Sequence, residues 1–479
     1  MEDKISGMSI NSKNECGRIV EIKELDESFD GRTVIVRGFV LKCSCTGRYV
    51  FVVLRDDGCT LQCMAEKPTD GADGKLLDEF KSLKKVTHES YVEIRGVIAR
   101  QEVEISGCSK KSIELRVAGI FVLSAADKSL PFSMKDVQAT IEERERNPAL
   151  PTVAYHIRLD NRAMDLRVMQ TRAVFRVIDG IMFFFRMHLR RNGFVEIKTP
   201  KLIESSSEGG ANLFSVDYFK QKAYMAQSPQ LYKQMAIIGG MKKVYEIGHV
   251  YRAEESNINR YLSEFVGLDM EMEISTDYND VIKLIYSMLV DIFDGLKNDY
   301  GDDLETIRMF HVYEDINYGH EPVVLTHREC TDLLVAEGVD IKYGEDFNNE
   351  NEKRLGGIVK SLHGVDIFVI KDYPVSIRPF YTYRNKEEGT TRSYDFILRG
   401  EEILSGAQRV DCYSDLLGYV KEHGIAPESL GGYLESFKYG APPHGGCGIG
   451  LERLAKAYFG MADIRCFSLF PRDPNRLYP

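Results

Sequence analysis

Residues 243–274 read KVYEIGHVYRAEESNINRYLSEFVGLDMEMEI, and the pattern of this stretch indicates a charged hairpin. Two segments in which apolar and polar residues alternate flank a polar loop, as in an antiparallel pair of strands. Arg252 and Glu254 project from one face, and the second strand carries acidic residues between apolar ones. A solvated hairpin explains charges on one face, but the interleaved Phe265 and Met270 indicate burial. The stretch therefore predicts charged groups held inside a sheet.

A Gly-rich strand that runs into a helix follows later, GCGIGLERLAKAY at residues 446–458. Gly446, Gly448 and Gly450 permit the backbone to approach a ligand closely. Arg453 falls in the first helical turn, and a helix N-terminus with an arginine forms an anion site. Gly-rich turns are common, so the stretch becomes specific only together with its neighbours.

Between these two lies RSYDFILRGEEILSGAQR, at residues 392–409. Asp395 and Glu402 can both reach one divalent ion. The alternative is a strand with exposed carboxylates, since charged runs usually face solvent. A phosphate loop of the GxxxxGK[ST] kind and a GxGxxG turn are both absent from the sequence.

The N-terminal part predicts a small β-barrel. RTVIVRGFVL, YVFVVLR, CTLQCMA, SYVEIRGVIA and SIELRVAGIFVL read as strands, with a helical segment near LLDEFKSL. Five strands and one helix favour an OB-type barrel over another small barrel or a sandwich. We expect this domain at residues 1–125, a polar, Pro-containing linker at 126–155 and a second domain at 156–479.

Composition narrows the class of protein. The net charge of −11 argues against non-specific nucleic-acid binding over the whole surface, although a local basic track stays possible. No apolar run reaches the roughly 18 residues that a membrane-spanning helix needs. The N-terminus lacks the layout of a secretory signal, and the ten cysteines have no zinc-site spacing. We expect a cytoplasmic protein that does not bind membranes.

Taken together, these stretches resemble the three motifs of class II aminoacyl-tRNA synthetases. FRMHLRRNGFVEIKTPKL, about residues 183–201, resembles motif 1, and VYRAEESNINRYLSEF and GIGLERL resemble motifs 2 and 3 within 243–274 and 446–458. SSEGGANLF, AQSPQLYKQ, IRPFYTY and the C-terminal LFPRDPNRLYP are similar to the eukaryotic and archaeal aspartyl-tRNA synthetase family. The resemblance covers almost the whole chain.

The resemblance implies a multidomain α+β protein. An N-terminal OB-fold five-stranded β-barrel would bind the anticodon, and the catalytic domain would hold a mainly antiparallel β-sheet flanked by helices. The implied activity is that of an aspartate–tRNA ligase, which forms aspartyl-adenylate from L-aspartate and ATP. It then transfers aspartate to the 3′ end of tRNA(Asp), releasing AMP and diphosphate. Mg²⁺ as cofactor and a homodimer are also implied.

The resemblance also assigns site residues. Arg252 and Arg453 are the implied catalytic residues. The implied ATP contacts are Arg252, Ala253, Glu254, Arg260, Tyr261, Leu262, Phe265, Glu402, Gly450, Leu451, Glu452 and Arg453. The implied aspartate contacts are Glu208, Gln230, Lys233, Arg252, Asp269, Ser405 and Arg409. Asp395, Glu402 and Ser405 would hold Mg²⁺, and Phe51, Gln62 and Glu114 would bind the anticodon.

The sequence departs from the family pattern in the motif 2 loop, where Asn259-Arg260-Tyr261 stands in place of His-Arg-His, and in motif 3, where Cys447 replaces glycine. Asparaginyl-tRNA synthetase is the nearest alternative, and Lys233 argues for aspartate because a neutral amide needs no lysine. Lys233 could instead be a solvated helix lysine, and Phe51 a core residue. A non-catalytic paralogue that binds RNA and an amide-forming ligase are further alternatives. The intact arginines argue against the first and the barrel against the second.

Overall fold

The computed structural model describes residues 18–68, 80–81, 83–204, 213–254 and 259–479. The chain divides into two compact units, Met1–Val137 and Gln138–Pro479. The division falls inside the predicted linker, where α2 (Met134–Val137) and α3 (Ile141–Arg146) are short helices. Thr140 and Glu143 close a capping box at the start of α3, which explains why a helix begins in this polar stretch.

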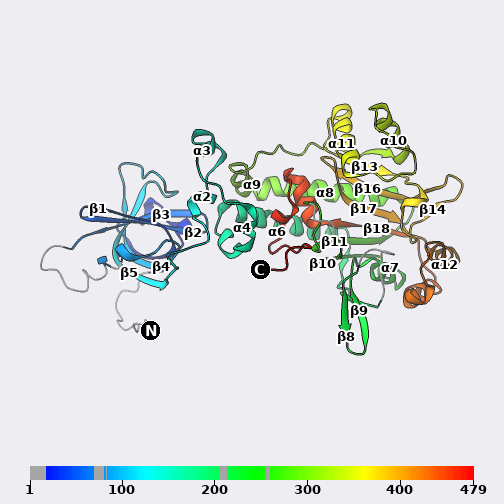
Figure 1. Ribbon diagram of the computed structural model, residues 1–479, viewed down its shortest axis with the longest axis horizontal. Helices are drawn as coiled ribbons and strands as arrows, with labels where there is room; N and C mark the ends of the chain where they lie inside the picture. Colours follow the sequence, from blue (N-terminus) through cyan, green and yellow to red (C-terminus); the bar gives the residue numbers. More distant parts are fainter. Residues whose placement is uncertain (1–17, 69–79, 82, 205–212, 255–258) are drawn as a thin grey trace. The chain divides into compact units, whose positions relative to one another are not determined.

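The N-terminal unit is a closed five-stranded barrel, as predicted for an OB fold (Figure 1). Its strands are β1 (Thr33–Thr46), β2 (Tyr49–Asp56), β3 (Cys59–Glu66), β4 (Tyr91–Arg100) and β5 (Ile113–Ser124), in the order β1-β2-β3-β5-β4. Alternate residues such as Val50, Val52 and Leu54 fill the interior, because successive side chains of a strand point to opposite faces. Most of the helix expected at LLDEFKSL lies outside the described residues.

The larger unit is built on an eight-stranded sheet in the order β12-β13-β16-β17-β18-β11-β10-β6. Only the outer pairs β12–β13 and β10–β6 are parallel, so the sheet is mainly antiparallel, as predicted. Its strands are β6 (Val195–Glu196), β10 (Lys243–Tyr251), β11 (Glu264–Glu273), β12 (Val323–Thr326), β13 (Ile367–Lys371), β16 (Ser393–Leu398), β17 (Glu401–Gln408) and β18 (His444–Gly450).

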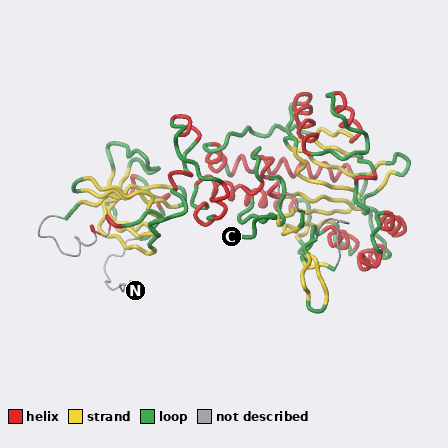
Figure 2. Tube along the Cα trace, in the orientation of Figure 1, coloured by secondary structure: helices red, strands yellow, loops and turns green. Residues whose placement is uncertain are grey.

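One main core joins this sheet to α6 (Met169–Arg191), α8 (Asn279–Asp299) and α14 (Leu451–Phe459), which bury their apolar sides against it. Figure 2 shows the two long helices running beside the strands. Met270 and Phe396 belong to this core, and their strand neighbours project from the opposite face of the sheet. That opposite face is therefore available for polar side chains.

Smaller elements surround the sheet. A hairpin of β8 (Ser215–Tyr218) and β9 (Gln221–Met225) joins β7 (Leu202–Ile203) in a separate three-stranded sheet (Figure 1). The remaining elements are α4 (Tyr155–Asp160), α5 (Arg162–Asp165), α7 (Gln230–Ile238), α9 (Gly301–Arg308), α10 (His327–Ala336), α11 (Asn349–His363), α12 (Tyr413–Glu422), α13 (Gly431–Phe437), β14 (Arg384–Asn385) and β15 (Thr390–Thr391).

The predicted hairpin forms, but its first strand ends earlier than expected. β10 stops at Tyr251, so Arg252 and Glu254 begin the loop instead of sharing a strand face. A hydrogen bond from the Arg252 N–H to the Ser263 carbonyl, 2.9 Å long, still fixes the start of the loop. Among the described helices, none is both long and apolar enough to cross a membrane.

Candidate active site

A row of paired residues crosses the polar face of the sheet. Asp395 of β16 pairs with Ser405 of β17, Ser405 with Gly448 of β18, and Gly448 with Asp269 of β11. Paired residues on adjacent strands project from the same face. The sheet register thus brings together residues from three stretches that the sequence singles out separately.

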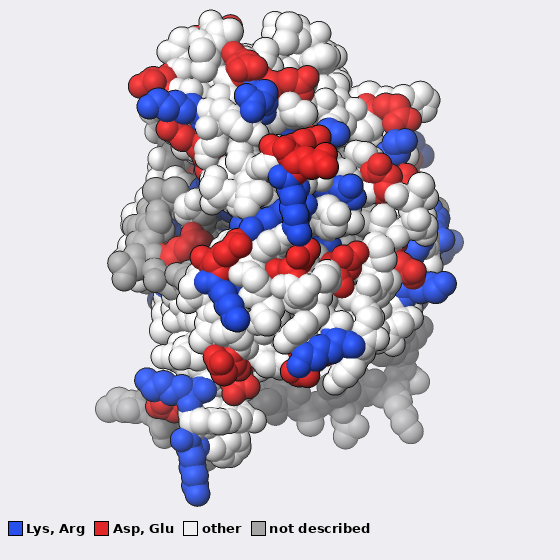
Figure 3. All heavy atoms as spheres, turned by 90° about the vertical axis from the view of Figure 1, so that its right-hand side faces the viewer, with Lys and Arg blue, Asp and Glu red and all other residues white. Residues whose placement is uncertain are grey.

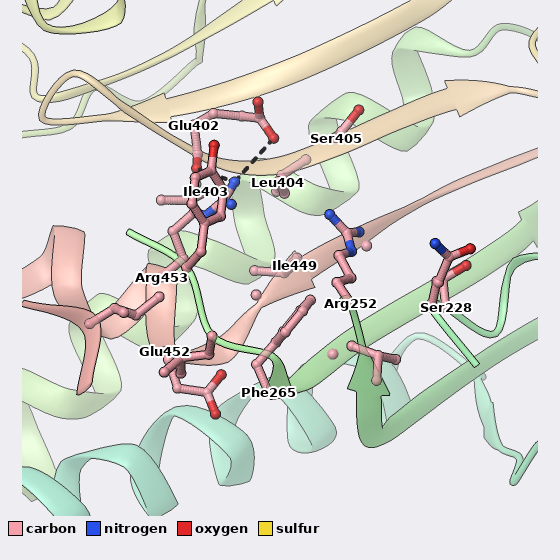
Figure 4. Close-up of a pocket in the computed structure, with 18 of the residues that line it drawn as sticks. Ser228, Arg252, Phe265, Glu402, Ile403, Leu404, Ser405, Ile449, Glu452 and Arg453 are labelled. Carbon is pink, nitrogen blue, oxygen red and sulfur yellow. Dashed lines mark hydrogen bonds and ion pairs between the residues drawn. The ribbon is translucent and has the colours of Figure 1, made fainter. Parts of the chain in front are cut away.

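A pocket opens over this row, and Figure 4 shows it in close-up. It is lined by Gln227, Ser228, Val250, Arg252, Glu254, Arg260, Tyr261, Leu262, Phe265, Gly267, Asp269, Glu402, Ile403, Leu404, Ser405, Gly448, Ile449, Gly450, Glu452, Arg453 and Ile464. All the predicted ATP contacts line it except Ala253 and Leu451. Leu451 is instead buried in the main core, because the first helical turn points it away from the pocket.

Two arginines and one aromatic ring dominate this pocket. Figure 4 shows Arg252 and Phe265 projecting into the same space, with Arg453 on the other side of Phe265. The guanidinium carbon of Arg252 lies 5.4 Å from the centre of the Phe265 ring. In the described part of the chain, the Arg252 side chain forms no ion pair. An arginine in this position can donate hydrogen bonds to a phosphate or carboxylate ligand without first breaking an ion pair within the protein.

Glu452 has a different kind of contact. Its carboxylate oxygens lie 3.2 and 3.1 Å from the Val266 N–H and accept a hydrogen bond from it. Burial raises the pKa of Glu452 to about 7. This side chain ties the start of α14 to β11, so it positions Arg453 and Phe265 relative to each other.

Lys233 has partners within the protein that the sequence did not predict. It is only 2% exposed, so the alternative of a solvated helix lysine is wrong. Its Nζ lies 3.0 Å from Asp269 Oδ1 and 3.4 Å from Glu271 Oε2, and it also donates to the Cys447 carbonyl at 3.0 Å. Lys233 therefore has two carboxylate partners within the protein.

Arg409 belongs to the same buried network. Its Nε and Nη2 lie 2.9 and 3.2 Å from the two carboxylate oxygens of Glu271, and these contacts hold the pKa of Glu271 below its usual value despite burial. A Cβ at Gly446 would lie 2.5 Å from that carboxylate, so this glycine accommodates Glu271 and not an external ligand. Lys233 and Arg409 thus face two buried carboxylates, Asp269 and Glu271, and the four charges balance.

The predicted aspartate contacts divide into two groups. Arg252, Asp269 and Ser405 line the pocket, whereas Gln230, Lys233 and Arg409 are buried just beyond its lining. The side-chain amide nitrogen of Gln230 is buried and has no hydrogen-bond partner among the described residues. A buried donor without a partner is unfavourable, which points to a ligand atom at this place. Glu208 lies outside the described residues.

The three predicted metal-binding residues differ in their surroundings. Glu402 and Ser405 line the pocket, and Asp395 is buried next to it. Arg378 donates to Asp395 Oδ2 at 2.5 Å, while Asp395 Oδ1 is buried with no hydrogen-bond partner among the described residues. Burial and the nearby Asp395 carboxylate raise the pKa of Glu402 to about 7. A buried carboxylate oxygen without a hydrogen-bond partner and a second carboxylate with a raised pKa are groups that fit a bound cation.

Arg260 is held against α11. Its Nη2 lies 2.9 and 2.7 Å from the two oxygens of Glu352, and its Nη1 lies 3.0 Å from Asn349 Oδ1. Glu352 also accepts the backbone N–H of Glu402 at 3.0 Å. Glu352 thereby joins the motif 2 loop to β17, the strand that carries Glu402 and Ser405. Arg260 and the adjacent Tyr261 both line the pocket.

Cys447 is accommodated in the core. Its side chain is fully buried in the main core, opposite Met270 of β11, on the face of β18 that points away from the pocket. Gly448 and Gly450, on the other face, line the pocket. The departure from glycine at position 447 therefore leaves the pocket surface unchanged.

Of the predicted anticodon residues, Phe51 and Gln62 are partly exposed on the outside of the barrel, whereas Glu114 is buried. Phe51 is half-buried between the core residues Val50 and Val52, so it is not a core residue. Gln62 Nε2 donates to Glu114 Oε2 at 2.7 Å. The strand register places Gln62 two residues from the partner of Phe51, on the same face.

Several residues of the site were not assigned from the sequence: Gln227, Ser228, Glu271, Glu352 and Arg378. Gln227 and Ser228 belong to AQSPQLYKQ, one of the stretches that resemble the family, and their position directly before a helix was an available signal. Arg378 lies in IRPFYTY, another stretch that resembles the family. The sequence did not mark Glu352 as a site residue, because glutamate is common in the first turn of a helix.

Comparison with known proteins places the chain in a family. The family model "tRNA synthetases class II (D, K and N)" matches residues 154–474. The chain is 74% identical over 479 residues to a "Probable aspartate--tRNA ligase, cytoplasmic" of Encephalitozoon cuniculi, covering the whole of both chains.

Two solved structures of related proteins are similar over nearly their full lengths. The structure of a putative aspartyl-tRNA synthetase from Leishmania major Friedlin has a TM-score of 0.90 and 32% identity, covering 99% of this chain and 97% of that one. That of asparaginyl-tRNA synthetase from Pyrococcus horikoshii with asparaginyl-adenylate has a TM-score of 0.81 and 26% identity, covering 96% and 99%. The chain therefore belongs to the class II tRNA synthetases, within the family of aspartate–tRNA ligases.

Proposed function

We propose that this protein is a cytoplasmic aspartate–tRNA ligase that forms aspartyl-adenylate from L-aspartate and ATP and transfers aspartate to tRNA(Asp). The observation that carries the proposal is the pocket in which Arg252, Phe265 and Arg453 converge beside the buried Lys233 network. The relative named as an aspartate ligase, at 74% identity, supports aspartate over the asparagine alternative.

The chemistry of the first step suits a pocket of arginines. The carboxylate of aspartate attacks the α-phosphorus of ATP, and diphosphate leaves. Because this nucleophile is already ionised, no protein base is required. Catalysis then consists of positioning the reactants and stabilising negative charge on the phosphoryl oxygens. Arg252, which has no ion-pair partner in the described structure, serves this purpose.

Arg453 and Phe265 bind the adenine from two sides. The ring of Phe265 offers a stacking surface, and a guanidinium stacks on the opposite face of a planar base. Glu452 fixes this arrangement through its hydrogen bond with Val266. Arg260 then contacts the outer phosphates from the position in which Glu352 holds it.

Asp395, Glu402 and Ser405 are the residues that would hold Mg²⁺. Members of class II use ATP, generally with a divalent metal. When bound, the ion neutralises charge on the phosphates of ATP. The orphaned Oδ1 of Asp395 and the raised pKa of Glu402, about 7, support these two side chains as ligands.

Lys233 and Arg409 select aspartate. An amide and a carboxylate have nearly the same shape, so a site must separate them by charge and hydrogen bonding. Two buried cations can share an additional carboxylate, whereas the NH₂ group of asparagine would face donors. Sites of this kind discriminate by about 10⁴ or more. Asp269 and Glu271 hold the two cations in place through ion pairs.

The anticodon binds the barrel face that carries Phe51, Gln62 and Glu114, by stacking and base-edge hydrogen bonds. A broad basic surface is not evident on the face of the molecule shown in Figure 3, where Lys and Arg alternate with Asp and Glu. Near α12, for example, Lys386 pairs with Asp415 at 3.1 Å.

A homodimer is part of the proposal. Phe183 on α6 is 50% exposed and Val195 on the edge strand β6 is 52% exposed, both within the stretch that resembles motif 1. Apolar side chains of this size on neighbouring elements, beside an uncovered strand edge, suit a contact with a second copy of the chain.

The proposal is tested by ATP-dependent charging of tRNA(Asp) with radiolabelled aspartate. The wild type should charge this tRNA, and Arg252→Ala should lose roughly 10²–10³ in the rate of adenylate formation, or more, with an unchanged circular dichroism spectrum. If Arg252→Ala exchanged diphosphate within threefold of the wild-type rate, the assignment of Arg252 would be wrong. A wild type that charged no tRNA with aspartate would overturn the function.

A further inference from the structure

Both carboxylates of the proposed metal site are already paired with arginines. Arg378 Nη2 lies 2.5 Å from Asp395 Oδ2, and Arg378 Nη1 donates to Ser405 Oγ at 3.0 Å. Arg453 Nη1 lies 3.5 Å from Glu402 Oε1, a contact drawn in Figure 4. Each carboxylate of the proposed metal site is therefore paired with one arginine.

Arg378 is a fixed part of this site and not a mobile surface arginine. Its side chain is only 10% exposed, and its guanidinium carbon lies 3.6 Å from the centre of the Tyr373 ring. Tyr373 is itself buried in the core formed by α10, α11 and β13. A guanidinium that stacks on a buried ring and forms two side-chain hydrogen bonds has little freedom to leave.

A cation held this close to Asp395 weakens the attraction of that carboxylate for a free divalent ion, because like charges at short distance in a buried site repel strongly. The same cation favours a polyphosphate. Consistent with this, the described residues contain no group of three or more His, Cys, Asp or Glu side chains that could hold a metal ion by themselves.

We propose that Arg378 is a positioning residue that makes metal binding depend on ATP. It neutralises Asp395 and holds Ser405, and it leaves only the Oδ1 of Asp395 open to the ion. The divalent cation then binds tightly only when the phosphates of ATP supply additional negative charge and additional oxygen ligands. This inference rests on the proposed function, and it assigns to Arg378 a role that involves no contact with aspartate or the adenylate.

The coupling is measured with Mn²⁺ and electron paramagnetic resonance, which report metal binding without turnover. Free Mn²⁺ is titrated into the full-length protein with and without the non-cleavable α,β-methylene analogue of ATP. We expect Mn²⁺ to bind the complex of wild-type protein and analogue at least tenfold more tightly than it binds either the free protein or the free analogue. By reciprocity, Mn²⁺ should tighten binding of the analogue by the same factor.

Arg378→Met removes the charge but keeps an apolar chain against Tyr373. This variant should bind free Mn²⁺ at least tenfold more tightly than the wild type, with correspondingly weaker coupling to the analogue. The matched control is Arg384→Met, since Arg384 also stacks on a tyrosine, 3.5 Å from the ring centre of Tyr419, and pairs with Glu422 at 2.6 Å. The control should behave as the wild type.

Two results would overturn the inference. One is a wild type that binds free Mn²⁺ as tightly as it does with the analogue, a measurement that does not depend on any variant folding. The other is a folded Arg378→Met protein with unchanged affinity for free Mn²⁺. Failure of the proposed function is distinguishable, because it shows as a wild type that charges no tRNA with aspartate, whatever the Mn²⁺ titrations give.

Discussion

The ammonium of Lys233 lies 3.0 Å from Asp269 Oδ1, and both side chains are buried. The Lys233 ammonium also lies near Glu271, and Arg409 contacts both carboxylate oxygens of Glu271. An ammonium removed from water is stable only with such partners. The network therefore fixes two cations beside the pocket, where both can bind the side-chain carboxylate of a substrate.

Lys233→Leu should raise the Michaelis constant for aspartate at least a hundredfold and leave that for ATP near its wild-type value. The loss follows from the removal of one of two cations that meet the substrate carboxylate. Because the change also leaves Asp269 buried without a partner, we expect it to lower stability by roughly 3–5 kcal/mol. Diphosphate exchange and thermal unfolding measure the two effects separately.

The double variant Lys233→Leu/Asp269→Asn separates recognition from folding. It restores the charge balance, since Arg409 still neutralises Glu271. The melting temperature should recover, while activation of aspartate should stay impaired. Normal aspartate activation by the single variant would show that Lys233 does not contact the substrate.

Phe51→Ala and Gln62→Ala should each weaken tRNA charging and spare diphosphate exchange. Loss of base stacking on an aromatic ring costs about 1–3 kcal/mol, and a base-edge hydrogen bond contributes a similar amount. Phe121→Ala is the matched control, because Phe121 is a 53% exposed aromatic residue on another strand of the same barrel. Equal losses in both assays, or an equal effect of the control, would speak against an anticodon face.

The sequence predicted the barrel and the hairpin because both depend on local alternation. Four of the five barrel strands were located to within about one residue, whereas β1 continues to Thr46, beyond the predicted stretch; β10 and β11 followed from alternation and β18 from its glycines. Local patterns failed at the end of β10, where the ladder stops before Arg252. The loop is fixed there by the contact of Arg252 with Ser263, which alternation does not encode.

The internal partners of the site residues could not be predicted in the same way. Glu352 meets Arg260, and Arg378 meets Asp395, only because α11 and the turn before Pro379 pack against the β16–β17 strand pair. Such pairs depend on the three-dimensional register of distant segments. The sequence therefore named the charged groups of the site but not their internal partners.

Phe183→Glu should convert the proposed homodimer to a monomer at micromolar concentration. A buried carboxylate in an apolar contact would have no partner and would be strongly unfavourable. Val103→Glu is a control for the added charge, because Val103 is 81% exposed in the barrel unit. Sedimentation velocity distinguishes the two states, and a monomeric wild type would refute the dimer.

Glu452 should make stability depend on pH. Its pKa is raised from 4.5 to about 7 by burial, so the folded state favours the protonated form. The stabilisation that protonated Glu452 contributes to the free energy of unfolding is complete below about pH 4.5. It is lost as the pH rises toward 7, by about 1.4 kcal/mol per pH unit at most. Relative to the exposed control Glu428→Gln, the variant Glu452→Gln should lose this slope in urea unfolding. An unchanged slope would mean that Glu452 ionises normally.

Aspartate specificity is the central claim, and amino-acid-dependent exchange of diphosphate into ATP tests it most directly. The wild-type protein should exchange diphosphate with aspartate and should show a kcat/KM for asparagine lower by about 10⁴ or more, because an amide cannot pair with Lys233 and Arg409. Equal exchange with the two amino acids, or a preference for asparagine, would contradict the account.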